Sequence, residues 1–500
     1  MRQFAVCVAL LGLAACLGLP AAPPPTNPIR FLSINDVYVI DTLADGRGGL
    51  ARVATKREWL ASVGPTIFVL AGDELSPSLA SKFYNGRQMV ETLNAAKLDY
   101  ATFGNHEFDL ARDTLVARIA ASKFKWLSAN CTDTTGVAFP GVLAWDTLRT
   151  QGRLVGMFGL TMQGSYPRYV RCANPDSAAH RAVDTLTRLH ADLIVALTHQ
   201  PIADDRAMLT REPAIDLVLG GHEHEAHDEQ VGTRRILKAD ANARTAQFVT
   251  IWGDTAAWRI APTLVTIGAE LPLDTATARV VNAWQDSLRR RLGPEHVVAT
   301  ATAPIDARDS PSRRQESDIG NLVTDAIRSG TGADVALMNA GTMRLDDIIR
   351  PGPVTNYTLE SIFLFADEAR IVTFPLTGAR LRELLEHGVA AGSLGAGPFL
   401  QVSGISFTYD SSRASGSRLV GDVVRTGGRR IAPGDVVKVA FDVYPACESG
   451  DGYKVPEAAS ACERWESAPR SADLLMAYVR DSLGGKVAPP AGGRIKRAGS

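Results

Sequence analysis

The sequence predicts an α/β protein with two domains, and two observations support this. The chain has 500 residues, more than a single hydrophobic core usually supports. From about residue 29 to residue 271, short apolar runs alternate with helical stretches such as 87–96 and 177–189, and a second such pattern begins at Glu316. Short apolar runs of this kind are typical of strands that are buried on both faces of a sheet.

The chain begins with a segment that has the features of an export signal. Arg2 precedes an apolar stretch at 4–13, which is too short for a membrane-spanning helix. Leu-Ala-Ala-Cys follows at 13–16 and resembles the bacterial lipobox, in which Cys16 becomes the lipidated first residue. The alternative is an ordinary signal peptide that is cut near Ala21. We favour a lipid anchor, and in either case we expect a protein exported to the periplasm or cell envelope of a bacterium.

Composition restricts the partners of the mature chain. Apolar residues make up 45% and charged residues 21% of the sequence, which is ordinary for a soluble globular protein. The net charge of −1 gives no reason to expect binding to a nucleic acid polymer or to an anionic membrane surface. The basic segment 494–497 is expected to belong to a solvated tail. The oligomeric state is not predicted.

Four cysteines remain once the export segment is set aside. Four cysteines in an exported protein suggest two disulfides, for which three pairings exist. We favour Cys447–Cys462 because both residues lie in one short, loop-like stretch, and Cys131–Cys172 follows by subtraction. A zinc site built from the four cysteines is less expected because they are not at ligand spacing.

Five apolar runs in the first half of the chain end in residues that can bind a metal. Ligand sites in α/β sheets lie beyond the carboxyl ends of the strands, so these side chains are expected to converge. A single histidine or aspartate after a strand is more often a capping or solvated residue. Here, however, four of the nine histidines fall at run ends and none lies inside a run. The run-end residues are Asp36, Asp73, Asn105, His106, His199, His222 and His224.

The order of these blocks resembles that of the calcineurin-like metallophosphoesterases, and Gly-Asn-His-Glu-Phe-Asp at 104–109 resembles their 5′-nucleotidase branch. The resemblance implies a four-layer α/β/β/α metallophosphoesterase sandwich joined by a helix to a C-terminal α/β substrate-specificity domain. Apolar residues at helical spacing between 277 and 292, ended by Gly293-Pro294, predict the connecting helix. The expected ranges are 1–28 for the signal and Pro-rich tether, 29–272 for the first domain, 273–295 for the linker, 296–490 for the second domain and 491–500 for a basic tail.

The resemblance also implies two divalent ions, zinc, manganese or similar. Two such ions about 3.5–4 Å apart can clamp the attacking and the leaving oxygen of a phosphate ester. By resemblance, Asp73 bridges the ions. His199, His222 and Asn105 would complete one ligand set, and Asp36 with His224 the other.

The residues after Asn105 are expected to have different roles. His106 would face the substrate and stabilise charge on the phosphoryl oxygens or the leaving group. Asp109 would fix the tautomer of His106, although it is also a candidate N-cap because Leu110-Ala111 looks like a helix start. We expect Glu107 to be structural.

Tyr38 departs from the Asp-x-His pattern that the family usually carries after its first strand. A phenol with a pKa near 10 is a poor ligand for a divalent ion. One interpretation is a phenolate bound to iron, as in the related purple acid phosphatases, whose tyrosine has a different spacing. We favour the other, a neutral Tyr38 that leaves a weaker first metal site.

The second half of the chain carries motifs that resemble the 5′-nucleotidase C-terminal domain, at 313–322, 338–344, 363–365 and 450–453. The resemblance implies that two aromatic side chains sandwich the base and that others bind its edge, the ribose and the phosphate. The chain departs from the family in a loop that is one residue longer than usual, and we expect the carboxylate of Glu448, which this loop brings in, to disfavour multiply charged nucleotides. For the two aromatics the alternative is core packing. The implied substrate-binding residues are Phe365, Tyr444, Asn339, Gly341, Asp451, Arg313 and Arg344.

Together these features predict an exported metal-dependent phosphohydrolase that releases phosphate from nucleotides by in-line attack of a metal-bound hydroxide. Activity on 2′,3′-cyclic nucleotides or nucleotide sugars is compatible with the same centre. One alternative is a hydrolase of non-nucleotide esters on this scaffold. Another is a nucleotide-binding protein whose metal centre has decayed through Tyr38, against which the retained Asp73 and the later histidines argue.

Overall fold

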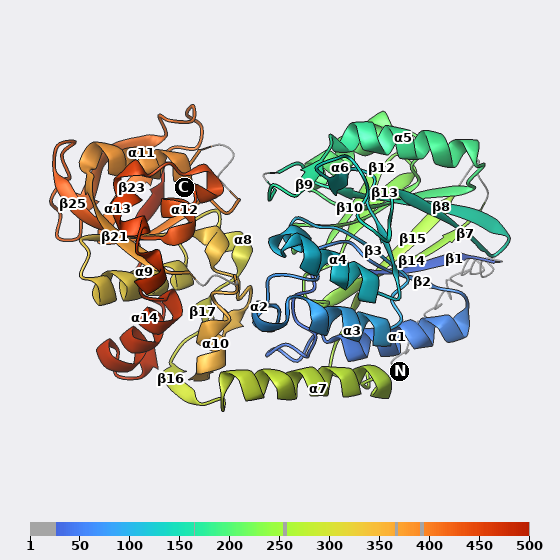
Figure 1. The fold of residues 1–500 in the computed structure, drawn as a ribbon, viewed down its shortest axis with the longest axis horizontal. Coiled ribbons are helices and arrows are strands. Elements are labelled where there is room, and N and C mark those ends of the chain that lie inside the picture. The colour runs from blue at the N-terminus through green and yellow to red at the C-terminus, as the bar shows by residue number, and fades with distance from the viewer. Residues whose placement is uncertain (1–26, 165, 254–257, 366–368, 391–394, 500) are drawn as a thin grey trace, which may run out of the picture.

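The computed structural model describes residues 27–499 apart from 165, 254–257, 366–368 and 391–394. The predicted export signal and Cys16 lie outside the described residues. None of the helices within these ranges combines the length and the apolar character needed to cross a bilayer. The α/β fold class and the two-domain architecture predicted from the sequence are confirmed (Figure 1).

The N-terminal domain is built on two sheets that face each other. The first has the strand order β15 (Arg259–Thr266), β14 (Thr245–Trp252), β1 (Ile29–Ile34), β2 (Ile67–Leu70), β3 (Tyr100–Thr102), β4 (Lys125–Leu127) and β6 (Val142–Leu143). The second has the order β12 (His227–Val231), β13 (Arg234–Lys238), β11 (Leu217–Gly221), β10 (Leu193–His199), β8 (Arg153–Thr161) and β7 (Trp145–Thr150). Their central strands are parallel, so the predicted ligand-bearing strands end at a common edge.

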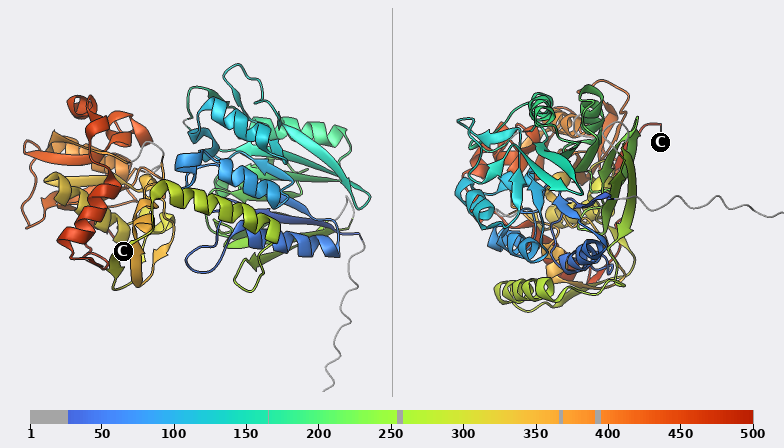
Figure 2. Two further views of the ribbon diagram at one scale, coloured as in Figure 1. Left: turned by 60° about the horizontal axis from the view of Figure 1, so that its bottom comes forward. Right: turned by 90° about the vertical axis from the view of Figure 1, so that its right-hand side faces the viewer.

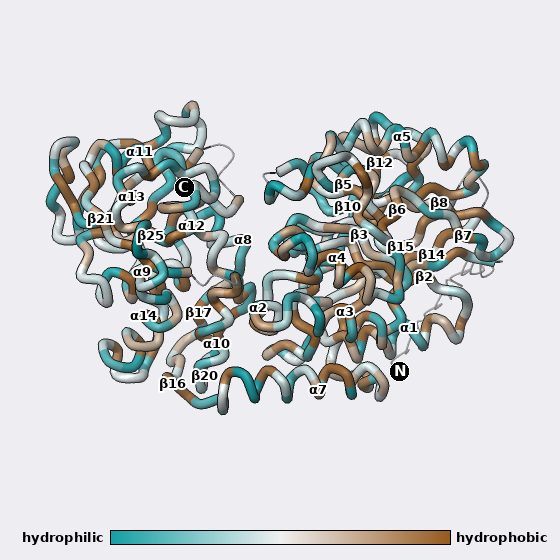
Figure 3. The backbone as a smooth tube through the Cα atoms, in the orientation of Figure 1, coloured by the Kyte–Doolittle hydropathy of each residue, from teal (hydrophilic) through white to brown (hydrophobic). Residues whose placement is uncertain are grey.

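Helices cover the outer faces of both sheets and complete the predicted four layers (Figures 1 and 2). The first sheet carries α1 (Leu50–Val63), α3 (Arg87–Ala95) and α4 (Arg112–Ala121), and the second carries α5 (Pro175–Arg188) and α6 (Ile202–Arg211). The short α2 (Ser81–Tyr84) lies beside α3, on the side that faces the C-terminal domain. One apolar cluster, which includes Phe31 and Leu193, fills the space between the sheets, and two others lie beneath the helices. Figure 3 shows that the hydrophobic segments follow the strands in the interior.

A single long helix, α7 (Thr275–Leu292), joins the domains as predicted. The Asp274 side chain caps its first turn by accepting the Thr277 N–H at 2.8 Å, and Gly293, with φ 78°, ends it. The helix lies along α1 and α3 and then reaches the C-terminal domain (Figure 2).

The C-terminal domain surrounds a mixed sheet in the order β21 (Ile371–Thr377), β25 (Val436–Asp442), β18 (Val335–Asn339) and β22 (Leu400–Ser403). Smaller sheets pair β16 (Val297–Ala301) with β20 (Gly352–Thr355) and β26 (Lys486–Val487), and β17 (Ile305–Asp306) with β19 (Ile348–Ile349). Its helices are α8 (Asp309–Ser312), α9 (Asp318–Thr331), α10 (Asn356–Glu360), α11 (Gly378–Gly388), α12 (Val443–Cys447), α13 (Ala459–Cys462) and α14 (Ser471–Ala477).

The end of the chain, expected to be a solvated basic tail, instead adds a strand to this domain. β27 (Ile495–Arg497) pairs with β23 (Ile405–Tyr409), which also pairs with β24 (Leu419–Arg425). Arg494 forms an ion pair with Asp325 at 2.7 Å, and Glu316 accepts the backbone N–H groups of residues 493–495. Strand pairing, backbone hydrogen bonds to Glu316 and the ion pair of Arg494 therefore hold this segment against the domain.

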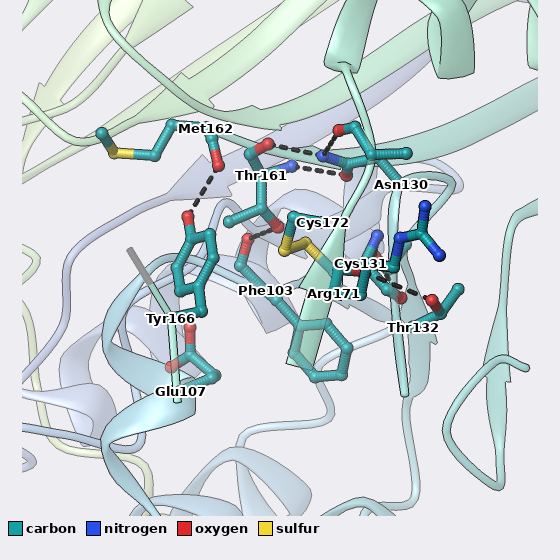
Figure 4. Close-up of a disulfide and its surroundings, with 12 residues drawn as sticks. Phe103, Glu107, Asn130, Cys131, Thr132, Thr161, Met162, Tyr166, Arg171 and Cys172 are labelled. Atoms are coloured by element: carbon teal, nitrogen blue, oxygen red, sulfur yellow. Dashed lines mark hydrogen bonds between the residues drawn. A yellow bond between two sulfur atoms is a disulfide. The ribbon is translucent and has the colours of Figure 1, made fainter. Parts of the chain in front are cut away.

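Both favoured disulfides are present. Cys447–Cys462 ties α12 to α13, and Cys131–Cys172 joins β5 (Cys131–Asp133) to β9 (Val170–Cys172). Figure 4 shows the second bridge beside Asn130 and Thr161. The Asn130 side chain bonds both backbone groups of Thr161, whose hydroxyl donates to the Phe103 carbonyl at 2.7 Å. The bridge therefore supports the loop that follows β3.

Candidate active site

The ends of five parallel strands bring the predicted metal ligands together. Nε2 of His199 lies 3.2 Å from an oxygen of Asp73 and 3.8 Å from one of Asp36. Nε2 of His224 lies 3.4 Å from the same Asp36 oxygen. The ring of His222 lies 5.4 Å from the ring of His199, measured between centroids. The ligand sets of both sheets thus face one shared space.

Three buried atoms at this centre are suited to binding a cation. Oδ1 of Asp36, Oδ1 of Asn105 and Nε2 of His199 form no hydrogen bond among the described residues, although His199 and Asp36 also lie within ion-pair distance of each other. Buried polar atoms are normally paired, since an unpaired one costs about 1–3 kcal/mol. Single ligand atoms of Asp36, Asp73 and His199 lie within 4.8 Å of one another, close enough to share an ion. The donor set of carboxylates and imidazoles suits zinc, manganese or iron.

The backbone at this centre is strained. Asp36, Asp73, His222 and His224 all have positive φ angles, of 51°, 59°, 95° and 63°. Residues other than glycine rarely adopt this region, and each such residue costs about 1–3 kcal/mol. Conformations of this kind persist where the surrounding structure enforces them, and they cluster at functional sites.

Glycines allow the ligand loops to approach closely, as the sequence suggested. A Cβ atom on Gly104 would lie 2.1 Å from an oxygen of Asp73. One on Gly72 would lie 2.6 Å from Nδ1 of His199. Any side chain at these positions would displace a predicted ligand.

Glu107 holds the loop that carries Asp73. Its carboxylate is fully buried and accepts four backbone N–H groups, those of residues 73, 74, 75 and 104. Glu107 thereby fixes the ends of β2 and β3 relative to each other. Its structural role was expected, but its connection to Asp73, the predicted bridging ligand, was not.

Charges are strongly coupled in the metal-free centre. Burial alone would raise the pKa of Asp36, but the imidazoles of His199 and His224 lower it to about 2. Burial opposes protonation of His199, yet Asp73 and Asp36 raise its pKa to about 9. Burial, together with His199, lowers the pKa of His222 to about 3. The two carboxylates therefore attract positive charge, which protonated His199 and His224 supply, whereas His222 stays neutral.

His106 and Asp109 form a pair beside the predicted metal ligands. Nδ1 of His106 lies 2.8 Å from Oδ2 of Asp109, and the His106 backbone N–H donates to Asp73 at 2.8 Å. Asp109 does not cap α4, because that helix begins at Arg112 with Ala111 in the N-cap position. The ring of His106 lies 5.8 Å from that of Phe365 in the other domain.

Tyr38 points its hydroxyl into the same space. The oxygen lies 3.1 Å from Oδ2 of Asp73 and 3.1 Å from Nε2 of His224. Burial, then Asp73 and Asp36, raise the pKa of the Tyr38 phenol well above its ordinary value. The phenol is therefore neutral in the metal-free protein.

The C-terminal domain contributes residues to this centre that the sequence did not reveal. Oδ2 of Asp346 lies 3.1 Å from Nδ1 of His224, and its other oxygen accepts the Asp309 N–H. Asp309 in turn binds Arg344 at 2.9 Å, and Arg344 donates to the Tyr38 hydroxyl at 3.3 Å. These contacts form a closed ring across the domain interface.

The predicted substrate-binding residues occupy the C-terminal side of the same region. Some of their side chains already bind other residues of the protein, and others are exposed. Asn339 donates to Asp451 at 2.7 Å and accepts the Thr342 hydroxyl, so its amide is already engaged. Arg313 and Arg344 share one oxygen of the buried Asp309.

Three further predicted residues lie at the surface or against backbone. Gly341 approaches Gly397, to whose carbonyl it donates at 3.0 Å. Tyr444, on α12, is 46% exposed, which argues against core packing. Phe365 is half-buried and lies next to His106.

Asp309 and Asp346 were missed because single acidic residues in a sequence look solvated. Asp346 stands two residues after Arg344, and Asp309 four residues before Arg313, so their nearness to predicted site motifs was the available signal.

Comparison with protein families matches residues 29–226 to the calcineurin-like phosphoesterases and residues 297–458 to the 5′-nucleotidase C-terminal domain. The chain is 24% identical to a snake venom 5′-nucleotidase of Naja atra, over 90% of this chain and 93% of that protein. It is also 24% identical to the 5′-nucleotidase of Homo sapiens, over 90% of this chain and 85% of that protein.

Solved structures show the same fold. A 5′-nucleotidase precursor from Thermus thermophilus superposes with a TM-score of 0.82 and 22% identity, covering 95% of this chain and all of that one (100%). The sulfate thiohydrolase SoxB of the same organism superposes with a TM-score of 0.78 and 19% identity, covering 95% and 98% of the two chains.

Proposed function

Because the chain belongs to the 5′-nucleotidase family of calcineurin-like phosphoesterases, we propose that it is an exported, metal-dependent phosphohydrolase that releases phosphate from nucleotides. The observation that carries this proposal is the meeting of Asp36, Asn105 and His199, whose buried ligand atoms form no hydrogen bond among the described residues. Activity on 2′,3′-cyclic nucleotides or nucleotide sugars is part of the proposal, because the same centre can act on several phosphate esters.

Two divalent ions would be held by residues of the N-terminal domain. Asp73 would lie between them, with Asp36 and His224 on one side and the remaining ligands, Asn105, His199 and His222, on the other. When bound, such ions supply Lewis acidity toward the phosphoryl oxygens and lower the pKa of water. Since Tyr38 is neutral and already bonded to Asp73 and His224, we propose that the first position is the weaker of the two.

The chain's own residues would bind and orient the substrate. His106, held through Nδ1 by Asp109, presents its other ring nitrogen for a hydrogen bond to a phosphoryl or leaving-group oxygen. Arg344 lies next to Tyr38 and would bind phosphate, a partner that guanidinium geometry favours.

Phe365 and Tyr444 would stack on the base. Stacking of this kind contributes about 1–3 kcal/mol per base with little base preference. Asn339, Gly341, Asp451 and Arg313 would line the rest of the pocket.

The test is phosphate release from AMP, UMP, ADP, ATP and UDP-glucose, with chelator and after adding back Mn²⁺ or Zn²⁺. We expect the protein to hydrolyse AMP or UMP, with activity that chelator abolishes and added metal restores. The His199→Ala variant should lack this activity. Nucleotide binding without turnover in added metal would support a decayed centre. Phosphatase activity that Phe365→Ala leaves unchanged would instead indicate an ester without a base.

A further inference from the structure

Beneath the predicted metal ligands lies a buried lysine that neither the family pattern nor the proposed chemistry uses. Lys238 is the last residue of β13, and its side chain is 0% exposed. Its amino group lies 2.7 Å from the Gln200 carbonyl and 2.8 Å from the Gly221 carbonyl. It also lies 2.6 Å from a Glu223 oxygen and 2.9 Å from an Asp205 oxygen. Lysine is rarely buried so completely unless it is paired.

The groups around this ammonium belong to the two segments that carry the three predicted histidine ligands. Gln200 directly follows His199, at the end of β10. Gly221 directly precedes His222, and Glu223 lies between His222 and His224. One nitrogen atom thus binds both segments from below.

The two carboxylates at this lysine extend the connection. Oε1 of Glu223 accepts the Ile202 N–H at the start of α6, at 2.5 Å. Oδ1 of Asp205 accepts the side-chain amide of Gln200 at 3.0 Å. The segment after β10 is therefore tied to the segment after β11 by side chains as well as by Lys238.

The conformation of the second segment explains why it needs such support. His222 and His224 both have positive φ angles, which the isolated chain would avoid. Lys238 binds the carbonyl just before His222 and the side chain just after it, so it opposes relaxation of this strained turn. An apolar side chain could fill the same core position but would offer no bond to either segment.

We propose that Lys238 is a positioning residue that sets the spacing of His199, His222 and His224 for metal binding. This role rests on the proposed metal centre. Residues that orient ligands from outside typically change metal affinity by about 10–100-fold when mutated.

The test compares Lys238→Met with a matched control, Arg494→Met, which breaks an ion pair with Asp325 in the other domain. Both variants remove a largely buried cation, but of the two residues only Lys238 contacts the segments that carry the predicted ligands. The measurements on the full chain are Mn²⁺ and Zn²⁺ affinity by chelator competition, bound metal per chain, and the melting temperature with and without metal.

We expect Lys238→Met to lower metal affinity about 10-fold or more and to shrink the metal-induced rise in melting temperature. Arg494→Met should lower the melting temperature of both forms equally and leave affinity unchanged. If Lys238→Met does not fold, Glu223→Gln, which keeps an acceptor for the Ile202 N–H, should show the same loss of affinity to a smaller extent.

Wild-type affinity in Lys238→Met, or in Glu223→Gln where that variant replaces it, would overturn the positioning role while leaving the metal centre intact. Wild-type protein that binds no metal would overturn the proposed function itself, and the role of Lys238 with it.

Discussion

Replacing Glu107 by glutamine tests how the loop that carries Asp73, the proposed bridging ligand, is held in place. The substitution conserves shape but exchanges one carboxylate oxygen for an NH₂ group. In the protein, one oxygen of Glu107 accepts the N–H groups of Glu74 and Leu75, and the other accepts those of Asp73 and Gly104.

The expected loss of unfolding free energy follows from the number of backbone N–H groups that lose an acceptor. Whichever way the amide turns, its NH₂ group faces two backbone N–H groups, which then lose their acceptor in a site without solvent. Each unsatisfied buried donor costs about 1–3 kcal/mol, so we expect Glu107→Gln to reduce the free energy of unfolding by about 2–6 kcal/mol. The Asp73 loop should also shift, which would weaken metal binding.

Urea unfolding of the metal-free protein measures the first effect, and metal content after dialysis measures the second. Glu316→Gln is a suitable control, since Glu316 also accepts backbone N–H groups but lies in the C-terminal domain. A loss of less than about 1 kcal/mol together with full metal content would refute the reasoning, because it would mean that the four N–H groups have other partners.

Three further predictions concern other parts of the chain. Asp346→Asn should weaken metal binding about 10-fold or more through His224, and unchanged affinity by chelator competition would contradict this. Replacing both cysteines of Cys131–Cys172, which are 41 residues apart, should cost about 4 kcal/mol in urea unfolding, whereas a negligible cost would argue against it. Burial, with Glu448 and Asp451, raises the pKa of Asp442 to about 7. In the unfolded chain the pKa of Asp442 is about 3.8, so the free energy of unfolding of the wild type falls as the pH rises from 3.8 toward 7. Asp442→Asn should become more stable relative to the wild type over that range, and a difference in unfolding free energy that does not change with pH would contradict this.

The sequence predicted the ligand-bearing strands well because their signal is local. Each apolar run is continuous and stops at a residue such as Asp36 or His199, so periodicity alone places both the strand and the side chain at its end. The same reasoning could not find Lys238 or Glu107. Their burial and their backbone partners arise from segments far apart in the chain, and an isolated charge in a sequence looks solvated.

Contacts between the domains could not be predicted from the sequence either. The ring through Asp346, Asp309 and Arg344 depends on how α7 sets the C-terminal domain against the ligand loops. Local spacing predicted that helix but carries no information about how the second domain is oriented relative to the first. The C-terminal segment was misjudged for a similar reason, since Arg494 meets Asp325, and the backbone N–H groups of this segment meet Glu316, only after folding.

Six side chains from five strand ends are proposed to enclose two cations. Anomalous scattering from crystals of the protein prepared with Mn²⁺ or Zn²⁺ would locate these ions. We expect two peaks about 3.5–4 Å apart, both within bonding distance of Asp73. Peaks at other places, or no peak beside Asp73 in protein that retains metal, would contradict this proposal.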